Sequence, residues 1–251
     1  MKDLRMLIVV LIVTILSSCN TDKSKTKPGV EETKQAEFVS DTLTKHLKPF
    51  NPNLPTIGLL MYNGVLQSEV VATSDVFAKP AEDGSQIFNV IIIAETEKPI
   101  TTEEGLRLIP DYTFQNCPKL KALFVPSAYD MYSHIHNDKI VNFIKEKNKE
   151  TDYTVSNCAG AQLIGASEIA DGHKIVTWIG GGEQLQKDYP NLKVQNDSSI
   201  TYVKDGKFLS SNGNLTSYIS ALELLEIMTS PEHRKFVESY LYLDRLQNWK
   251  E

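Results

Sequence analysis

The sequence predicts an α/β fold with a mainly parallel central sheet that is covered by helices on both faces. Three observations carry this prediction. Several short apolar runs are continuous rather than alternating, segments that suit helices separate them, and one run ends abruptly at a cysteine among small residues. Strands that are apolar at every position are buried on both faces, and parallel strands need crossover helices between them.

The elements of the first half alternate along the chain. Thr56–Tyr62 is an apolar strand that ends at a turn, and Val65–Phe77 suits a helix that stops before a proline. Phe88–Ala94 is the strongest strand in the sequence. Arg107–Thr113 is a weak strand interrupted by a proline, and Ala122–Val125 is a buried strand closed by a proline. Asn137 can cap a helix that runs to about Lys147.

The second half continues this pattern. Tyr153–Ser156 is a β-rich run, Lys174–Trp178 reads as a strand, and three glycines, 180–182, break it before a short helix over Glu183–Tyr189. Asp205-Gly206 is the best hairpin signal, flanked by Ile200–Val203 and Phe208–Ser210. Two helices close the chain: Thr216–Met228, and one that starts at Ser230-Pro231 and seals the domain.

The stretch Tyr153–Gly165 predicts a nucleophile elbow, which is a strand that turns sharply into a helix with a reactive residue at the corner. Cys158 occupies the corner, and Ala159, Gly160 and Ala161 provide the small neighbours that a tight turn needs. A helix N-terminus favours negative charge, so we expect the thiol pKa of Cys158 to fall. A buried structural cysteine is the alternative interpretation.

Composition excludes two classes of protein. The chain has 251 residues and a net charge of −6, and no basic stripe follows the N-terminus, so nucleic acid is not an expected partner. Three cysteines are too few for a disulfide-stapled scaffold.

The N-terminus predicts a lipid anchor. A charged start and an apolar run over Met6–Leu16 precede Ser17-Ser18-Cys19, which resembles the bacterial lipobox. Cys19 would be the lipidated residue, and the protein would lie in the cell envelope, anchored to a bacterial membrane on its periplasmic or surface side. An ordinary signal peptide is the alternative. We therefore divide the chain into a signal peptide (1–18), a lipidated cysteine with a flexible tether (19–54), the folded domain (55–229) and a C-terminal helix packed on it (230–251). A short helix over Phe38–Leu47 fits the end of the tether.

Four stretches together resemble the ThiJ/PfpI family of the class I glutamine amidotransferase-like superfamily: Leu59–Phe77, Lys121–Asp130, Tyr153–Trp178 and the region Lys204–Ser217. The most specific pieces are Asn157-Cys158-Ala159-Gly160-Ala161 followed by Leu163-Ile164-Gly165, Glu69 ahead of Ser74-Asp75-Val76-Phe77, and Ser211-Asn212-Gly213. The resemblance implies a flavodoxin-like sandwich, with Cys158 as nucleophile and Glu69 as its acidic partner. A carboxyl group near a thiolate in a dry pocket has a raised pKa. A solvated helix-face charge is the alternative for Glu69.

The departures from the family pattern bear on function. Many relatives carry two glycines after the strand that ends before Pro126, where this chain has Ser127-Ala128. We expect backbone N–H groups near these residues and at Ala159 to hold an oxyanion. The positions where relatives carry a histidine hold Trp178 and Ala159, so a Cys–His pair is not supported and protease chemistry is not expected.

Other motifs are weaker evidence of function. His134-x-His136 is a weak metal signal, and a polar loop near the pocket is the preferred interpretation. Tyr129 and Tyr132 would shape a substrate wall or lie at the surface. Glycines 180–182 lack the lysine of a phosphate loop, and we expect a flexible pocket edge. Cys117 is expected to be structural or incidental, and a disulfide with Cys158 in an oxidising envelope is the alternative.

The leading prediction is a cofactor-independent and metal-free cysteine enzyme, a hydratase, hydrolase or lyase acting on small reactive carbonyl or isocyanide substrates. The alternative is a metabolite-binding or redox-sensing domain without catalysis, related to the ligand-binding halves of transcription regulators. A third reading is an envelope stress protein that shares the thiol. Expected partners are a small molecule and, through the N-terminal lipid, a membrane; a homodimer is left open.

Overall fold

The computed structural model describes residues 48–247, and the compact unit begins at Phe50. The predicted signal peptide, Cys19 and the predicted helix Phe38–Leu47 lie outside the described residues. Within the described range, no helix is both long and apolar enough to span a bilayer.

A seven-stranded sheet forms the centre of this unit, in the order β10-β11-β7-β6-β1-β2-β5. Every neighbouring pair is parallel except β10 and β11, which form the predicted antiparallel hairpin around Asp205-Gly206. This confirms the predicted α/β class with a mainly parallel sheet. Its strands are β1 (Thr56–Leu60), β2 (Asn89–Ala94), β5 (Tyr112–Thr113), β6 (Ala122–Val125), β7 (Tyr153–Asn157), β10 (Tyr202–Asp205) and β11 (Phe208–Ser211).

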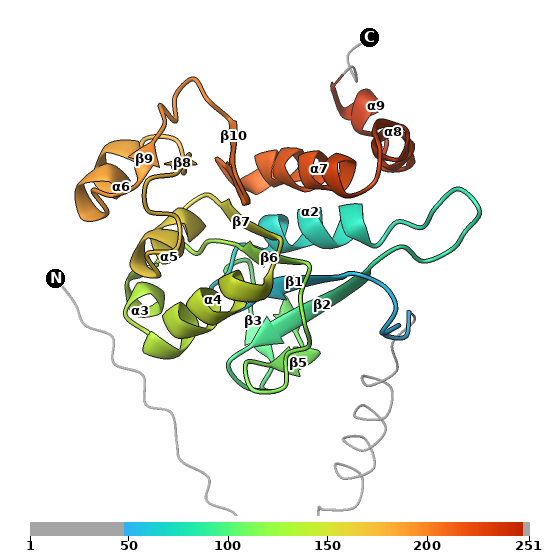
Figure 1. Ribbon diagram of the computed structural model, residues 1–251, viewed down its shortest axis with the longest axis horizontal. Coiled ribbons are helices and arrows are strands. Elements are labelled where there is room, and N and C mark those ends of the chain that lie inside the picture. Colours follow the sequence, from blue (N-terminus) through green and yellow to red (C-terminus); the bar gives the residue numbers. More distant parts are fainter. Residues whose placement is uncertain (1–47, 248–251) are drawn as a thin grey trace, which may run out of the picture. The chain divides into compact units, whose positions relative to one another are not determined.

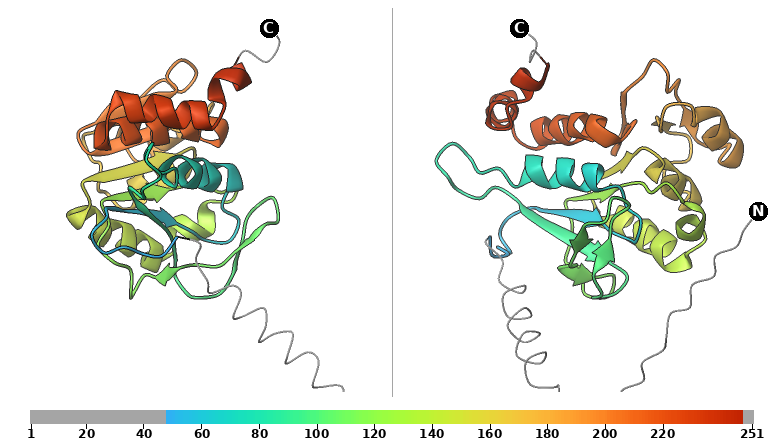
Figure 2. Two further views of the ribbon diagram at one scale, coloured as in Figure 1. Left: turned by 90° about the vertical axis from the view of Figure 1, so that its right-hand side faces the viewer. Right: turned by 180° about the vertical axis from the view of Figure 1, so that it is seen from behind.

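Helices cover both faces of the sheet, with α2, α7 and α8 on one side and α3, α4 and α5 on the other (Figures 1 and 2). The helices are α2 (Gln67–Phe77), α3 (Tyr132–Ile135), α4 (Asp138–Glu150), α5 (Gly160–Ala166), α6 (Gly182–Asp188), α7 (Ser217–Met228), α8 (Pro231–Tyr240) and α9 (Leu243–Gln247). Asn137 caps α4 as predicted, because its side chain accepts a hydrogen bond from the N–H of Lys139 at 3.0 Å.

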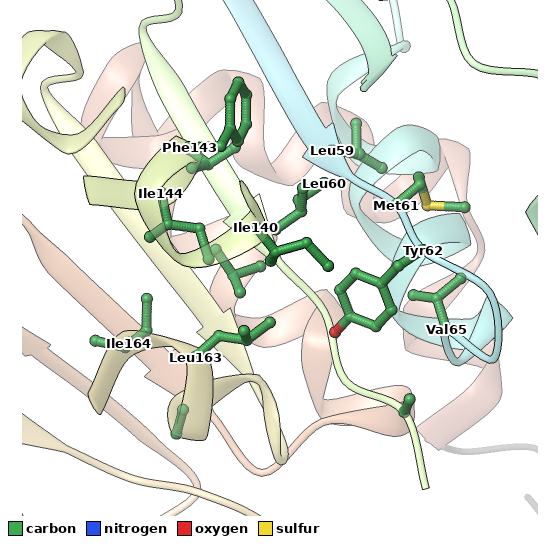
Figure 3. Packing of buried hydrophobic residues seen from close by; sticks show 14 of the residues in the cluster. Leu59, Leu60, Met61, Tyr62, Val65, Ile140, Phe143, Ile144, Leu163 and Ile164 are labelled. Carbon is green, nitrogen blue, oxygen red and sulfur yellow. The ribbon is translucent and has the colours of Figure 1, made fainter. Parts of the chain in front are cut away.

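Two apolar clusters hold the layers together. One joins the sheet to α4 and α5 and contains Leu59, Ile144 and Leu163, all at most 1% exposed (Figure 3). The other joins the opposite face to α2, α7 and α8, with Phe77, Leu224 and Val237 at its centre. Because Val237 is fully buried, α8 belongs to the core of the unit, whereas Tyr240 remains 55% exposed at its end.

Two predicted strands are wrong in their extent. Arg107–Thr113 divides into β4 (Arg107–Leu108), which pairs with β3 (Ile100–Thr101), and β5 at the edge of the main sheet. Pro110 lies between them and lacks the N–H that a continuous ladder needs.

The predicted strand Lys174–Trp178 shrinks to β8 (Lys174–Ile175), which pairs with β9 (Lys193–Val194) outside the main sheet. The ladder ends at Ile175, and the N–H of the next residue, Val176, donates to Oγ of Ser210 at 2.9 Å. The next residue, Thr177, is hydrogen-bonded to Cys158 and Asn212, which directly follow the carboxyl ends of β7 and β11.

Candidate functional site

The candidate site lies at the carboxyl ends of the parallel strands, where the loops after β1, β6, β7 and β11 meet. In an open α/β sheet this edge is where ligands bind, because the loops from neighbouring strands converge there. Each of the four loops contributes to the site: Leu66 follows β1, Ser127 follows β6, Cys158 follows β7 and Gly213 follows β11.

Cys158 occupies the predicted elbow between β7 and α5. Its φ of 51° lies in the left-handed region, which costs an L-residue roughly 1–2 kcal/mol. Two hydrogen bonds hold this conformation. The N–H of Cys158 donates to the carbonyl of Ser211 at 2.9 Å, and Oγ1 of Thr177 donates to the carbonyl of Cys158 at 2.9 Å. The elbow is therefore fixed from β11 and from the segment after β8.

Gly160 shows why the elbow needs small residues. A Cβ on this glycine would lie 2.3 Å from the carbonyl oxygen of Val125, which is far inside contact distance. The start of α5 thus packs directly against the end of β6. This contact brings the loop after β6 next to the cysteine.

Glu69 comes from the first turn of α2 and is only 1% exposed. Its Oε2 accepts a hydrogen bond from the N–H of Ser127 at 2.7 Å, and its Oε1 accepts from Oγ of Ser127 at 3.0 Å and from the N–H of Asn214 at 3.2 Å. Burial raises the pKa of Glu69 from 4.5 to about 7 against these hydrogen bonds, which lower it. The predicted rise is confirmed, and the carboxyl group is poised to exchange a proton near neutral pH.

Gly213 packs between the cysteine and the glutamate. Its φ of 86° and ψ of −167° suit glycine almost exclusively. A Cβ there would lie 2.2 Å from Cβ of Cys158 and 2.4 Å from Oε1 of Glu69. The bare Cα of Gly213 therefore allows the two groups to approach each other, and the loop after β11 is part of the site.

The thiol does not behave as its position at a helix N-terminus predicts. Burial and, after it, the negative charge of Glu69 raise the pKa of Cys158 from 9.0 to about 11. The Ser127 hydroxyl and the Ala159 N–H lower it, but by less. The predicted fall is wrong, because desolvation and a like charge outweigh the dipole of the short helix α5. At neutral pH with Glu69 ionised, the thiol therefore keeps its proton.

A pocket of about 880 Å³ opens above the cysteine. Aromatic and aliphatic side chains form most of its wall, and amide side chains supply most of the polar groups. The lining residues include Leu66, Tyr129, Met131, Tyr132, Ile135, Cys158, Gln162, Trp178, Ile179, Asn212 and Leu215. The exposed side chains of Tyr129, Tyr132 and Leu215 show that this wall reaches the protein surface.

The predicted site residues separate into two layers. Cys158, Ala159, Ala128 and Trp178 line the pocket, whereas Ser127, fully buried, and Glu69 are not among its lining residues. The amides after β6 are occupied: the Ser127 N–H donates to Glu69, and the Ala128 N–H donates to Sδ of Met131 at 3.2 Å. In this geometry, these two amides therefore do not form the oxyanion hole that the sequence predicts. The Ala159 N–H is the predicted oxyanion-hole amide that lowers the pKa of the Cys158 thiol.

The glycines 180–182 support the pocket wall. A Cβ on Gly181 would lie 1.9 Å from the indole ring of Trp178, so only a glycine lets the ring pack at this position. Gly182 donates its N–H to Asp197 at 2.7 Å. The triplet thus positions Trp178 rather than binding a phosphate.

The histidines stay outside the pocket wall. The ring of His134 packs on buried Tyr62 with centroids 4.1 Å apart, and Nδ1 of His136 lies 2.8 Å from the carbonyl oxygen of Tyr132. Figure 3 shows Tyr62 within the apolar cluster. Across residues 48–247, no group of histidine, cysteine, aspartate or glutamate side chains is arranged to hold a metal ion.

Cys117 and Cys158 are both free thiols. Cys117 precedes the amino end of β6, whereas Cys158 follows the carboxyl end of the parallel strand β7. The two thiols therefore lie at opposite edges of the sheet. Burial raises the pKa of Cys117 to about 11, in keeping with a structural residue.

The fold and the site together define a class of protein: a flavodoxin-type α/β sandwich with a cysteine at a nucleophile elbow and a buried glutamate beside it. Residues 55–227 match the DJ-1/PfpI family, and the chain belongs to this family. The sequence is 26% identical over 121 residues to an isonitrile hydratase from Pseudomonas putida, a match that covers 48% of this chain and 51% of that protein. The matched segment thus spans about half the length of this relative.

Solved structures show the same fold. A ThiJ/PfpI family protein from Pseudomonas syringae superposes with a TM-score of 0.69 at 18% identity, covering 80% of this chain and 83% of that chain. Drosophila melanogaster DJ-1beta gives a TM-score of 0.66 at 16% identity, covering 75% of this chain and 98% of that chain.

Proposed function

We propose that this protein is a cysteine-dependent hydratase for small uncharged electrophiles, with isocyanides as the leading substrate class. The observation that carries the proposal is the packing of Cys158 and Glu69 on the bare Cα of Gly213, which places a thiol next to a buried carboxyl group whose pKa is about 7. A carboxyl group with that pKa can accept the thiol proton and return it within one reaction cycle.

The pocket wall supports an uncharged substrate. Among the described residues that line it, none is a lysine or an arginine, and aromatic and aliphatic side chains predominate. A carboxylate or phosphate group would therefore lose its hydration without gaining a cationic partner. An isocyanide, R–N≡C, has a linear and uncharged reactive end, and its R group would pack on Trp178, Met131 and Leu66. A small 2-oxoaldehyde meets the same requirements and is the second substrate class.

The chemistry needs only groups that are present in the site, together with water. The Cys158 sulfur bonds to the terminal isocyanide carbon, and the proton released from the thiol is delivered to that carbon, which gives the thioimidate R–N=CH–S–Cys158. Water then adds to the same carbon while one of its protons passes to nitrogen. Cleavage of the C–S bond releases R–NH–CHO, and the remaining proton returns to sulfur. Glu69 accepts and returns protons in these steps.

The test is conversion of benzyl isocyanide to N-benzylformamide, followed by chromatography. We expect turnover by the wild type and by Cys117→Ser, and a loss of at least 100-fold in Cys158→Ser. Methylglyoxal, assayed with the same variants, tests the second substrate class. Full activity of Cys158→Ser would show that the nucleophile is assigned wrongly.

A second candidate function is ligand binding without catalysis. It is favoured by one observation, the thiol pKa of about 11, which leaves Cys158 protonated beside a large pocket. This function predicts a stable complex with an apolar isocyanide, measured by calorimetry, with no formamide product and equal affinity in Cys158→Ser. The same experiments therefore separate the two functions.

We also propose that the protein acts in the bacterial envelope, anchored through Cys19. The lipobox-like Leu16-Ser17-Ser18-Cys19 after an apolar run supports this proposal. Lipid labelling of the wild type and release of Cys19→Ala from membranes test it. An unlabelled wild type would contradict it.

A further inference from the structure

Asn212 is a polar side chain of the pocket wall to which the chemistry above assigns no role. It directly follows β11 and is only 7% exposed. Its backbone N–H donates to the carbonyl of Thr201 at 3.1 Å, and its Nδ2 donates to the carbonyl of Thr177 at 2.7 Å. Thr177 in turn donates its hydroxyl hydrogen to the carbonyl of Cys158 at 2.9 Å. Asn212 is therefore held by two hydrogen bonds, and one of them ties it to the elbow.

The hydrogen bond to Thr177 fixes the orientation of the Asn212 amide. A backbone carbonyl only accepts hydrogen bonds, so the side-chain nitrogen has to face Thr177, and Oδ1 takes the other branch of the amide. Among the described residues, Oδ1 has no hydrogen-bond donor, yet it is not one of the partnerless polar atoms that are shut off from solvent. Because Asn212 lines the pocket, this oxygen is an acceptor for a molecule bound there.

The residues on either side of Asn212 both contact the elbow. The carbonyl of Ser211 accepts the N–H of Cys158 at 2.9 Å, and a Cβ on Gly213 would lie 2.2 Å from Cβ of Cys158. The side chain of Asn212 therefore leaves the backbone between two points of contact with the cysteine. This places its oriented acceptor at the end of the pocket where a group bonded to sulfur would lie.

The other acceptors near the cysteine are less suited to a bound molecule. Glu69 does not line the pocket. Gln184 and Asp188 are exposed, and the Gln184 amide donates to the Asp188 carboxylate at 2.7 Å. Gln162 is half-buried, and within residues 48–247 no hydrogen bond of its side chain orients the amide. Asn212 thus combines burial, a fixed orientation and an open acceptor.

We propose that Oδ1 of Asn212 orients the water molecule that hydrolyses the thioimidate on Cys158. This role rests on the proposed function, in which R–N=CH–S–Cys158 forms first. The water donates one hydrogen to Oδ1, and an oxygen lone pair bonds to the thioimidate carbon. The electron pair of the C=N π bond moves to nitrogen, which takes the other proton of the water. The product is R–NH–CH(OH)–S–Cys158, whose new hydroxyl group still donates to Oδ1.

A neutral amide suits this step better than a carboxylate would. Asn212 takes no proton and places no second negative charge beside Glu69 and the departing sulfur. A carboxylate at this position would also face the carbonyl of Thr177 without a hydrogen to donate. The first step, in which sulfur bonds to the isocyanide carbon, uses no water and so does not need this acceptor. Asn212 therefore acts in the second step of the reaction.

The test measures formation and hydrolysis of the Cys158 adduct separately, in the full chain. Protein is mixed with benzyl isocyanide and quenched at successive times, and mass spectrometry of the Cys158 peptide gives the adduct fraction; dilution into isocyanide-free buffer then gives the rate of hydrolysis. We expect Asn212→Ala to form the adduct within about twofold of the wild-type rate and to hydrolyse it roughly tenfold or more slowly, so that the adduct accumulates.

Asn89→Ala is the matched control. Asn89 is also buried, 3% exposed, and its amide donates to the carbonyl of Asn51 at 2.8 Å, but it lies at the amino end of β2, at the sheet edge opposite the pocket. This variant should keep both wild-type rates. If thermal melting shows that Asn212→Ala is unfolded, Asn212→Leu replaces it, because leucine keeps the branched shape of the side chain without its acceptor.

Hydrolysis at the wild-type rate in Asn212→Ala would overturn the proposal. Equal slowing of both steps would overturn it as well, since a displaced elbow affects the sulfur as much as the water. The proposed function is judged on the wild type alone. A wild type that forms neither adduct nor formamide would remove the proposed function and this role with it, whereas wild-type turnover with unchanged hydrolysis in Asn212→Ala would remove only the role of Asn212.

Discussion

Replacing Gly213 with alanine should damage both the stability and the chemistry of the site. The backbone conformation, φ 86° and ψ −167°, costs a residue with a side chain roughly 1–3 kcal/mol. The new Cβ would also lie 2.2 Å from Cβ of Cys158 and 2.4 Å from Oε1 of Glu69, and such overpacking adds about 1–3 kcal/mol. We therefore expect Gly213→Ala to lower the free energy of unfolding by roughly 2–6 kcal/mol, the sum of the two costs.

Gly172→Ala is the matched control. Gly172 has a similar φ of 77°, but a Cβ there would meet nothing within 4 Å, so only the backbone cost of roughly 1–2 kcal/mol applies. Urea unfolding measures the stability of both variants, and iodoacetamide alkylation at pH 7 measures the thiol. We expect Gly213→Ala to be the less stable variant and the only one with an altered alkylation rate. Equal stabilities together with a wild-type alkylation rate in both would refute the contact between Gly213, Cys158 and Glu69.

Two further predictions concern Glu69 and Cys158. The pKa of Glu69 in the folded protein is raised from 4.5 to about 7, so the contribution of Glu69 to stability should be greatest below pH 4.5 and fall by roughly 3 kcal/mol as the pH rises through 7. In Glu69→Gln, urea unfolding across the same pH range should lack this fall. Parallel curves of unfolding free energy against pH for the wild type and Glu69→Gln would contradict the burial of an ionisable carboxyl group. At Cys158, with φ 51°, glycine should give a more stable protein than alanine by about 1 kcal/mol, and the proposed chemistry predicts that both variants are inactive. A less stable glycine variant in thermal melts would argue against strain at the elbow.

The sequence predicted the parts of this fold that depend on local chemistry. The apolar run Val90–Ala94 predicted a strand of a covered sheet, and the small residues after Cys158 indicated the elbow. The cap at Asn137 and the hairpin at Asp205-Gly206 are equally local. These features depend on neighbours in the chain, which the sequence displays directly.

The sequence could not predict the contacts that turn these parts into a site. Glu69 was identified through the family resemblance, and nothing near it in the chain indicates that it accepts the N–H of Asn214, 145 residues away. The pKa of Cys158 depends on burial, which is a property of the folded state, and so the local argument from the helix dipole gave the wrong direction. Ser127 was expected to offer its amide to a substrate, but that amide binds Glu69.

The signal for the missed contacts was present only in part. Gly213 follows Asn212 in a dipeptide typical of turns, which indicates a special backbone conformation without saying what lies against it. Likewise, glycines 180–182 indicate a break in the chain but not the indole ring that packs on Gly181. Both contacts cross from one loop to another at the sheet edge, and only the topology brings these loops together.

Trapping of the covalent intermediate tests the central claim most directly. Wild-type protein is mixed with benzyl isocyanide, quenched in acid within the first turnovers, digested and analysed by mass spectrometry. The proposed chemistry predicts the mass of one benzyl isocyanide on the peptide containing Cys158, none on the peptide containing Cys117, and disappearance of the adduct as N-benzylformamide forms. Formation of the formamide with Cys158 unmodified throughout, or equal modification of Cys117, would contradict it.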